Sequence, residues 1–299
     1  MVERTTKVCS PQEAAALVRD GDTIGIGGIV STNRPMAVLR RLMKERRSNL
    51  SMITFQGGLD IDLMIGLDMV KRLTVSYMGA EALAPVTPFY GRRACDGTLE
   101  VDEVDLGTVL FMLRARALRL PFLPSWGPVG TSLPKLNPRL KVVEDPFGGP
   151  PVVAIPPAHV DVAILQANQA DRYGNVQHIG ASYGDALVAH AADRVIVQVE
   201  KLVSNEEVRK SPRDTTIYHG VVDAVVVAPY GSHPFACQNY YQRDETHLRE
   251  YVQAARALLE GRPEEFQAYV ARYIDVPSSI AEYVQAVGME RILSLAMEQ

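Results

Sequence analysis

The residues with the clearest potential for chemistry are two paired glycines, each of which follows an apolar strand. Gly27-Gly28 ends an apolar run that begins at residue 22, and Gly57-Gly58 follows another at 51–55. Glycines let a backbone approach a ligand closely and turn its N–H groups outward, and a helix N-terminus favours negative charge. The pattern predicts a cradle for an anionic group such as a carboxylate, an enolate or a phosphate.

The spacing of these glycines does not fit a dinucleotide-binding loop. Gly25 and Gly27 supply the first two glycines of that motif, but Val30 occupies the third position. The strand at 51–55 ends in Gln56-Gly57-Gly58, with no acid that would bind a ribose hydroxyl. No lysine follows as in a phosphate-binding Walker loop. The sequence therefore disfavours an enzyme that uses nicotinamide or a nucleoside triphosphate.

Composition places the chain among ordinary globular proteins. Of its 299 residues, 47% are hydrophobic and 22% are charged, and the formal net charge is −4. Mild acidity without a dense basic run predicts no nucleic-acid partner. Cys9, Cys95 and Cys237 are too far apart for a metal motif or a disulfide framework, so we expect no metal and a reducing, cytoplasmic compartment. We find no apolar run near the roughly 18 residues that span a bilayer and no signal-peptide core, which predicts no membrane partner.

Short β-rich runs alternate with helical ones along most of the chain. Strands with continuous apolar faces, interleaved with helices, predict an α/β fold: an open, mostly parallel sheet with helices on both faces. The expected strands are 23–27, 51–55, 73–78, 141–143, 152–155, 160–165, 195–200 and 224–227. The expected helices are 11–19, 35–45, 62–70, 106–118, 185–192 and 205–210.

Several helix starts carry local signals. Pro35 suits the first position of a helix, with Thr32 or Asn33 as its cap. Ser204 fits a capping box, and Asp244 is the expected cap of the next long helix.

The pattern changes after residue 245 to long amphipathic helices. We expect them at 245–259, at 263–273 and from 278 to the C-terminus. This division predicts an α/β domain over residues 1–245 and a C-terminal helical appendix over 246–299.

A serine-hydrolase motif competes with the anion cradle. Gly180-Ala-Ser-Tyr-Gly184 matches the nucleophile elbow of α/β-hydrolases and precedes a predicted helix. The segment before it, Asn175-Val-Gln-His-Ile, is a poor buried strand, and no His-Gly-Gly oxyanion segment precedes it. A plain glycine-rich turn is the favoured interpretation. Acids and histidines that follow in suitable order are Asp193, Asp214, Asp223, His219, His233 and His247.

Further candidate site residues lie outside the glycine pairs. Glu103, in the acidic stretch 100–105, is the carboxylate that we expect to face the crevice if any does. Gly130 and Thr131 end a proline-rich loop and offer backbone donors, while Ser31 and Gln56 flank the glycine pairs. These four residues join the glycines in the predicted substrate-binding set.

Taken together, the segments resemble the α subunits of class I coenzyme A transferases of the glutaconate CoA-transferase type. The likeness covers residues 10–255, and its strength lies in many pieces that occur in the same order. They are Ile26-Gly-Gly28, Asn33-Arg-Pro-Met36, Phe55-Gln-Gly-Gly58, Leu120-Pro-Phe-Leu-Pro124, Gly130-Thr131, Asp145-Pro-Phe-Gly-Gly149, Val160-Asp-Val-Ala-Ile164, Ala170-Asp-Arg-Tyr-Gly-Asn175, Gln198-Val-Glu-Lys-Leu-Val203, Pro229-Tyr-Gly-Ser-His-Pro234 and Tyr241-Gln-Arg-Asp244.

The resemblance implies an α/β heteromer that moves coenzyme A between carboxylic acids. A glutamate attacks the acyl-CoA carbonyl, and the reaction continues through a glutamyl-CoA thioester, which is covalent catalysis. In two-subunit members this glutamate belongs to the β subunit, and we find no matching glutamate motif here. The substrates implied are an acyl-CoA and a carboxylic acid, with no permanently bound cofactor. The amides of Gly27, Gly28, Gly57 and Gly58 would then stabilise developing negative charge.

A branch of the same family leaves an alternative open. In actinobacterial steroid degradation, related enzymes hydrolyse a carbon–carbon bond in a ring of a CoA thioester, with the working glutamate on the α chain near the equivalent of 100–107. Leu106 stands before Gly107 where that branch leads us to expect a glutamate, which favours the transferase. A second alternative is a non-catalytic sensor or scaffold, since the fold also hosts sugar-phosphate isomerases and translation-factor subunits. The resemblance makes the serine hydrolase a minor hypothesis.

Overall fold

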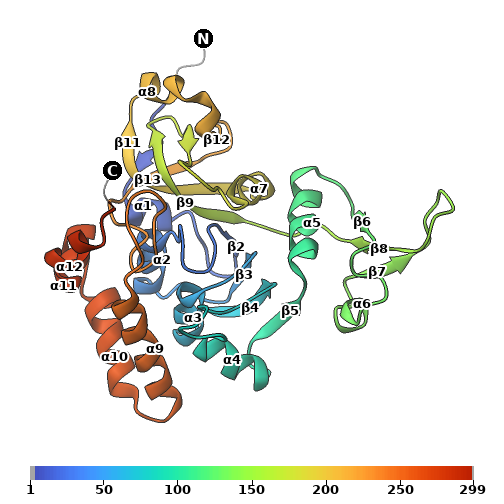
Figure 1. Ribbon diagram of the computed structural model, residues 1–299, viewed down its shortest axis with the longest axis horizontal. Helices are drawn as coiled ribbons and strands as arrows, with labels where there is room; N and C mark the ends of the chain where they lie inside the picture. The colour runs from blue at the N-terminus through green and yellow to red at the C-terminus, as the bar shows by residue number, and fades with distance from the viewer. Residues whose placement is uncertain (1–3, 298–299) are drawn as a thin grey trace.

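The computed structural model describes residues 4–297, and its centre is a ten-stranded sheet (Figure 1). The neighbours along its main path pair in parallel. The path runs β1 (Val8–Cys9), β13 (Ala224–Val227), β11 (Arg194–Val203), β9 (Val162–Asp171), β2 (Thr23–Ile26), β3 (Leu50–Thr54), β4 (Val70–Val75) and β5 (Glu100–Glu103). Two short strands, β10 (Val176–Gln177) and β12 (Thr215–Ile217), add antiparallel pairs beside β9. The predicted parallel α/β sheet is confirmed.

Helices cover both faces of this sheet, as the sequence predicts. Alternate residues of a strand point to opposite faces, and in β9 the side chain of Ile164 enters one apolar cluster while Ala163 and Leu165 enter the other. The first cluster is closed by α1 (Pro11–Ala15), α2 (Met36–Lys44), α3 (Leu59–Gly66) and α4 (Pro88–Cys95). The second is closed by α5 (Leu106–Ala117) and α7 (Asp185–Ala191). The short α8 (Asn205–Lys210) follows β11.

Two helices that shape the site start at other residues than expected. Helix α2 begins at Met36 after Pro35, with no side-chain cap, because the Asn33 side chain instead accepts a hydrogen bond from the Gln238 amide at 3.0 Å. The cap predicted at Thr32 or Asn33 is therefore wrong. Helix α3 begins at Leu59, directly after the second glycine pair, three residues before the predicted start at 62.

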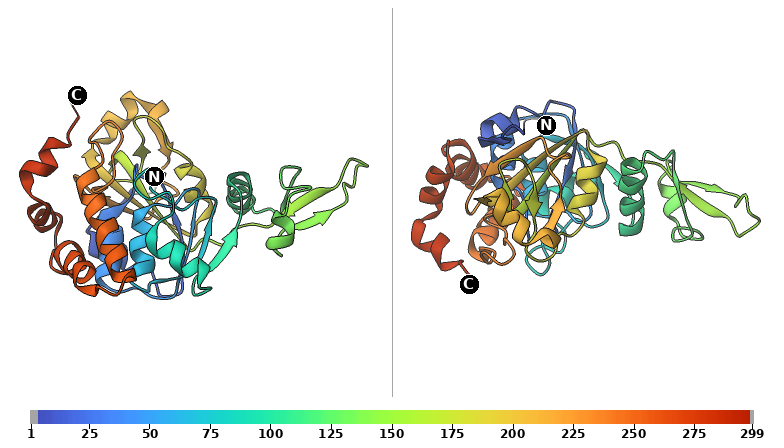
Figure 2. Two further views of the ribbon diagram at one scale, coloured as in Figure 1. Left: turned by 60° about the horizontal axis from the view of Figure 1, so that its bottom comes forward. Right: turned by 90° about the horizontal axis from the view of Figure 1, so that it is seen from above.

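The segment between α5 and β9 forms an arm that projects from the body (Figures 1 and 2). It contains β6 (Leu123–Ser125), α6 (Leu133–Leu136), β7 (Lys141–Val143) and β8 (Val152–Ile155). The sequence predicts strands at 141–143 and 152–155 but assigns them to the parallel sheet. The structure pairs them antiparallel in a separate three-stranded sheet in the order β6-β8-β7, which corrects that assignment.

The C-terminal helices lie against the first face of the body. They are α9 (Glu245–Leu259), α10 (Pro263–Val270), a π-helical turn (Ala271–Asp275), α11 (Ile280–Val287) and α12 (Met289–Ser294). The helix predicted at 263–273 thus changes to a π-helical turn, and the one predicted from 278 breaks at Gly288, whose φ is 109°. Its last residues, 298–299, lie outside the described residues. Apolar side chains of these helices share one cluster with the body, and the domain boundary at 245 stays a prediction.

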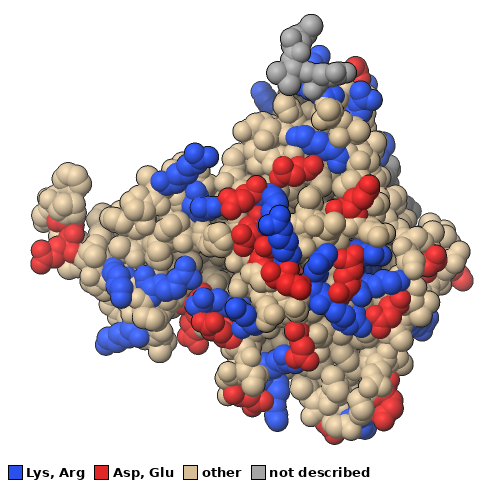
Figure 3. All heavy atoms as spheres, turned by 180° about the vertical axis from the view of Figure 1, so that it is seen from behind, with Lys and Arg blue, Asp and Glu red and all other residues tan. Residues whose placement is uncertain are grey.

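Basic and acidic side chains are interspersed over the body on the face that Figure 3 shows. Many charged side chains of the molecule form ion pairs, such as Arg72–Glu100 at 2.7 Å and Arg116–Asp193 at 2.6 Å. Within residues 4–297, no helix combines the length and the apolar character needed to cross a bilayer.

Candidate active site

The two glycine pairs lie side by side at the carboxyl edge of the sheet. Strands β2 and β3 are parallel neighbours, so the bends that follow them emerge at the same edge. The amide of Val30 donates to the carbonyl of Gln56 at 3.3 Å, and the Thr54 hydroxyl donates to the carbonyl of Ile26 at 3.1 Å. A Cβ on Gly58 would lie 2.3 Å from the Val30 carbonyl oxygen, so only glycine permits this approach. The predicted convergence of the two bends is present in the structure.

The first bend is held by a loop from the far end of the chain. The Asn33 amide donates to the carbonyl of Ala236 at 2.8 Å, and the Ala236 amide donates to the carbonyl of Ser31 at 3.0 Å. The Arg34 amide donates to the Ser232 hydroxyl oxygen at 2.9 Å. These bonds stabilise a backbone in which Asn33 adopts a positive φ of 53°. Ser31, a predicted site residue, is buried in this contact.

A buried carboxyl group supports that loop from below. Glu200 accepts hydrogen bonds from the Tyr230 amide at 2.6 Å, the Tyr241 hydroxyl at 2.7 Å and the Gln166 side chain at 2.9 Å. Burial raises the pKa of Glu200 to about 7. With its oxygens bonded inside the chain, Glu200 positions the loop.

Three of the four glycine amides are bonded within the chain. Gly27 donates to the Ile164 carbonyl at 3.1 Å, Gly57 donates to the Tyr77 carbonyl at 2.9 Å, and Gly28 donates to the Asp185 carboxylate at 2.8 Å. The amide role predicted for these three glycines is therefore wrong, because neighbouring backbone and Asp185 already accept their protons. Among the described residues nothing accepts from Gly58, which stands at the N-cap of α3.

Sequence reasoning missed the buried acid behind the first bend. Asp185 opens α7, and its second carboxylate oxygen lies 3.3 Å from Nε2 of the buried His178. The other ring nitrogen of His178 lies 2.6 Å from the Thr216 hydroxyl. Asp185 directly follows the glycine-rich turn at 180–184, so an acid at the start of a helix was the available signal.

Glu103, the candidate carboxylate of this chain, ends the edge strand β5. Strand β4 separates β5 from β3, so at the usual strand spacing Glu103 lies about 10 Å along the edge from the second bend. Its side chain is exposed, and no described residue donates a hydrogen bond to its carboxylate. Its backbone carbonyl accepts from the Asn137 side chain at 3.1 Å. Glu103 lies at the same edge of the sheet as the two bends, but no hydrogen bond from a described residue directs its carboxylate toward them.

Gly130 and Thr131 lie on the arm, in the turn between β6 and α6. The arm stands away from β2 and β3 in both Figures 1 and 2. Gly130 has a φ of 79° with open space around its Cβ position, and the Thr131 hydroxyl donates to the Pro128 carbonyl at 2.8 Å. The single chain does not bring these two residues to the glycine bends, and their role in substrate binding stays a prediction. Gln56 is half-buried at the second bend.

The serine-hydrolase hypothesis is wrong on geometry. The strand before the motif, β10, has two residues and pairs antiparallel with β9, whereas a nucleophile elbow follows a central parallel strand. No hydrogen bond joins the Ser182 hydroxyl to a histidine among the described residues. The turn uses the Ser182 carbonyl to accept from the amide of Asp185 at 2.8 Å.

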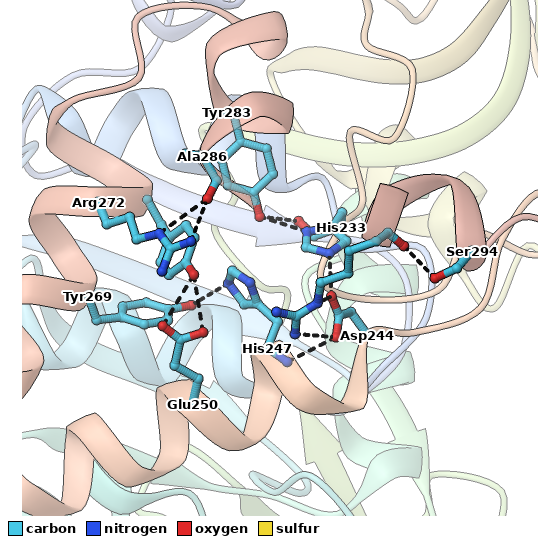
Figure 4. A network of polar contacts seen from close by, with 11 residues as sticks. His233, Asp244, His247, Glu250, Tyr269, Arg272, Tyr283, Ala286 and Ser294 are labelled. Atoms are coloured by element: carbon cyan, nitrogen blue, oxygen red, sulfur yellow. Dashed lines mark hydrogen bonds and ion pairs between the residues drawn. The ribbon is translucent and has the colours of Figure 1, made fainter. Parts of the chain in front are cut away.

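One cluster has the residue types of a metal site but not its chemistry (Figure 4). His233, Asp244 and His247 have potential ligand atoms within 4.8 Å of one another. The Asp244 carboxylate already binds the Arg291 guanidinium, at 2.5 and 2.7 Å, and His233 Nδ1 lies 2.7 Å from the Tyr283 hydroxyl. A cation placed here would lie beside the positive charge of Arg291. The cluster therefore fits a polar joint between the C-terminal helices and the loop at 231–238.

Comparison with known proteins decides the family. Residues 8–228 match the model of the coenzyme A transferase family. The chain belongs to the coenzyme A transferase family. It is 31% identical to the A-type subunit of glutaconate CoA-transferase from Acidaminococcus fermentans, over 97% of this chain and 94% of that one. The crystal structure of that enzyme matches with a TM-score of 0.91 at 29% identity, covering 98% of this chain and 96% of that chain.

Other members of the family with different names are comparably similar. The cholesterol ring-cleaving hydrolase IpdA subunit of Rhodococcus jostii is 31% identical over 92% of this chain and 94% of that one. A crystal structure of the decarboxylase AibA/AibB matches with a TM-score of 0.78 at 30% identity, covering 89% of this chain and 99% of that chain. The chain spans only 63% of an Archaeoglobus fulgidus protein to which it is 32% identical. The resemblance found in the sequence is confirmed, and the chain aligns with A-type subunits over nearly its whole length.

Proposed function

We propose that this chain is the α subunit of a heteromeric acyl-CoA transferase that moves coenzyme A between carboxylic acids. The nucleophilic glutamate belongs to a β-type partner. It attacks the acyl-CoA carbonyl and releases CoA thiolate, which then attacks the enzyme carbonyl of the mixed anhydride. This step frees the first acid and leaves a glutamyl-CoA thioester, from which a second acid takes CoA by the reverse steps.

One observation carries this proposal: at the converging bends one amide has no acceptor among the described residues, and no carboxylate of those residues is placed to attack. Gly58 is buried at the N-terminus of α3, and its N–H group has no acceptor among the described residues. The helix dipole there also favours negative charge. The nearby acids Asp60 and Asp185 are fully buried, and each has one oxygen bonded to this chain. Glu103 lies two strands away. A site of this kind stabilises an oxyanion and requires a nucleophile from elsewhere.

The projecting arm supports the presence of a partner chain. The side chains of Trp126 and Phe147 are 66% and 95% exposed, which is unusual for aromatic residues in a lone domain. Leu136 and Val142 add further exposed apolar surface on the same arm. The relatives named above include the A-type subunit of glutaconate CoA-transferase, which makes a β-type chain the natural partner.

The test measures CoA transfer by the purified chain with and without a β-type partner. We expect no activity from the chain alone, and ping-pong kinetics from the heteromer, because CoA rests on the enzyme between the two acids. Incubation with acyl-CoA and borohydride should inactivate the heteromer by reducing the glutamyl thioester on the partner. Full activity of the isolated chain would contradict the proposal.

The ring hydrolase is the second candidate, because the IpdA subunit is as similar to this chain as the A-type subunit of the transferase. In this alternative, water receives the acyl group and hydroxylamine or borohydride traps no CoA–enzyme thioester. Leu106 at the start of α5 favours the transferase, since the hydrolase branch leads us to expect a glutamate there. Binding of a sugar phosphate without affinity for CoA thioesters would instead favour a sensor or scaffold.

The proposal invokes a CoA thioester as substrate and no permanently bound cofactor. A cytoplasmic location is part of the same proposal and rests on three free thiols, Cys9, Cys95 and Cys237.

A further inference from the structure

A buried ion pair joins the two glycine bends. Arg34 belongs to the first bend and Asp60 to the first turn of α3, and both side chains are 0% exposed. Nε and Nη2 of Arg34 lie 2.7 and 2.6 Å from Oδ2 of Asp60. Nη1 of the same guanidinium donates to the carbonyl of Gly27 at 2.9 Å. One side chain therefore binds both bends at once.

We propose that Arg34 and Asp60 are positioning residues for acyl transfer: their ion pair fixes the two bends relative to each other and aims the Gly58 amide at the reacting oxygen. This inference rests on the proposed function, because it assigns the pair to that site. Neither side chain touches the substrate in this role.

The ion pair is the shortest link between the bends. The direct hydrogen bonds between them are longer, at 3.3 Å from Val30 to Gln56 and at 3.1 Å from Thr54 to Ile26. Nε donates to Oδ2 of Asp60 while Nη1 donates to the Gly27 carbonyl, so one planar guanidinium holds an acceptor from each bend in a fixed direction. Lysine has the same charge but a single ammonium group on a flexible stem, so it cannot hold the same orientation.

Stability alone does not account for two charges in this place. Moving an ion pair out of water costs free energy, and the attraction between the two charges often does no more than offset that cost. A protein with well-packed apolar residues in place of the pair is commonly as stable as one with the pair. Apolar side chains in the same place would not fix the orientation of the two bends. The pair is therefore better explained by the orientation that it imposes on the bends.

The charges of Arg34 and Asp60 have a second effect on the Gly58 amide. Oδ1 of Asp60 is buried without a hydrogen-bond donor among the described residues, and it lies 3.3 Å from the Cβ position of Gly58. A negative oxygen this close opposes an oxyanion at the Gly58 amide unless Arg34 neutralises it. Loss of Arg34 should consequently harm the reaction more than loss of the Asp60 charge.

The test compares three variants in the complete heteromer. Arg34→Lys should lower kcat about 10- to 100-fold, because a donor moved by a fraction of an ångström no longer meets the transition state. Its KM for acyl-CoA should stay within about threefold, since the interaction that is lost is made in the transition state rather than with the bound substrate. Asp60→Asn should lower kcat less. Asp62→Asn is the matched control, because Asp62 is buried in the same turn of α3 but accepts from the Tyr90 amide and the Tyr251 hydroxyl, each at 2.8 Å.

A second readout does not depend on activity. Hydrogen exchange of the isolated full chain should speed up in the peptides covering 27–34 and 55–62 in Arg34→Lys, and stay unchanged there in Asp62→Asn. If the wild-type heteromer transfers no CoA, the proposed function fails, and exchange at the bends still decides whether the pair holds them. Wild-type exchange at both bends in Arg34→Lys would overturn the inference.

The double variant Arg34→Met/Asp60→Leu tests the same inference if one of the single variants does not fold. It removes both charges and keeps an apolar volume, so it should fold as stably as wild type but show a low kcat and loosened bends. Wild-type kcat in this double variant would overturn the inference, because a purely packing role would then suffice.

Discussion

At the scale of single residues, the site depends on a position that can hold no side chain. The two bends approach so closely that the backbone of Val30 occupies the space of a Cβ on Gly58. Gly58 has an extended backbone, with φ −129° and ψ −161°, so its requirement for glycine comes from its neighbour and not from its own conformation. Gly28 differs, because it combines a φ of 72° with a Cβ position 2.2 Å from the Asn33 carbonyl oxygen.

Gly58→Ala tests this close approach. The new methyl group would push the bends apart and lower the free energy of unfolding by about 1–3 kcal/mol, as overpacking of a dense interior does. It should also abolish CoA transfer by the heteromer, since the Gly58 amide is the donor of the proposed site. Chemical denaturation of the isolated chain measures the first effect.

The control for this substitution is Gly91→Ala in the middle of α4. Its Cβ would approach only the side chain of Val86, at 3.0 Å, and that side chain is 57% exposed and free to move. Alanine also favours a helix over glycine, so we expect stability equal to or above that of wild type. Equal stability of Gly58→Ala and wild type would contradict the prediction, because the two bends could then move apart at little cost in free energy.

The sequence predicts which glycines matter but not which of their amides are free. Paired glycines after apolar strands indicate the bends, because that pattern is local. The acceptors of Gly27, Gly28 and Gly57 come from residues up to 157 positions away, so the sequence gives no sign of them. Asp60 and Asp62 were a usable signal, because acids inside the apolar run Leu59–Gly66 must be paired if that helix is buried.

At the scale of elements, the C-terminal helices meet the body through a polar joint in an apolar setting (Figure 4). His233 and His247 are buried, and their rings pack edge to face at 5.1 Å. Burial lowers the pKa of His233, and burial together with the neighbouring His233 lowers the pKa of His247 well below its ordinary value. Arg40 donates to the His233 carbonyl at 2.7 Å, so a further positive charge would be repelled.

Acid should therefore loosen this joint. Because both histidines have lowered pKa values when folded, the unfolded state takes up protons first as the pH falls. Their contribution to stability is complete above about pH 6.5 and is lost below it. We expect hydrogen exchange in the peptides of α11 and α12 to speed up at pH 5.5 relative to pH 7.5, after correction for intrinsic exchange.

His247→Gln isolates the titration from other groups. Glutamine keeps a polar contact to the Tyr269 hydroxyl, now 2.9 Å from His247 Nε2, but cannot be protonated. The variant should lose part of the pH dependence, whereas His159→Gln, at an exposed histidine, should keep it. Burial raises the pKa of Glu200 to about 7, so protonation of Glu200 stabilises the folded chain as the pH falls, opposite to the effect of the histidines. This contribution is the same in all the variants, so it cancels when they are compared. Identical pH dependence in all three proteins would contradict the prediction.

Elements with strong local signals are predicted to within one or two residues. Helix α9 starts where Asp244 caps it, and α8 starts after Ser204, whose hydroxyl accepts from the Glu207 amide at 3.1 Å. Elements defined by distant partners are not predicted. Strand β6 exists only through its pairing with β8, some 30 residues later, and the arm could not be separated from the sheet on pattern alone.

At the scale of the whole molecule, the arm is the feature that is hardest to explain if the chain acts alone. It extends a small sheet away from the body (Figure 2). Leu140, Val153 and Ile155 of the arm belong to the second cluster, but several other apolar side chains of the arm stay exposed. Burial of such surface is the main favourable term in protein association. We therefore expect the arm to contact the β-type partner that the proposed function requires.

Trp126 allows this assembly to be observed directly, because it is the single tryptophan of the chain and lies exposed on the arm. Adding a β-type partner that lacks tryptophan should shift its emission to shorter wavelength, as water is excluded from the ring. Phe147→Ser should weaken the heteromer about tenfold or more, since a buried aromatic anchor contributes over 1 kcal/mol to an interface. Val276→Ser, at a residue 71% exposed beside the C-terminal helices, should leave the affinity unchanged. A heteromer that forms without altering Trp126 emission, and with equal affinity in both variants, would place the partner elsewhere on the molecule.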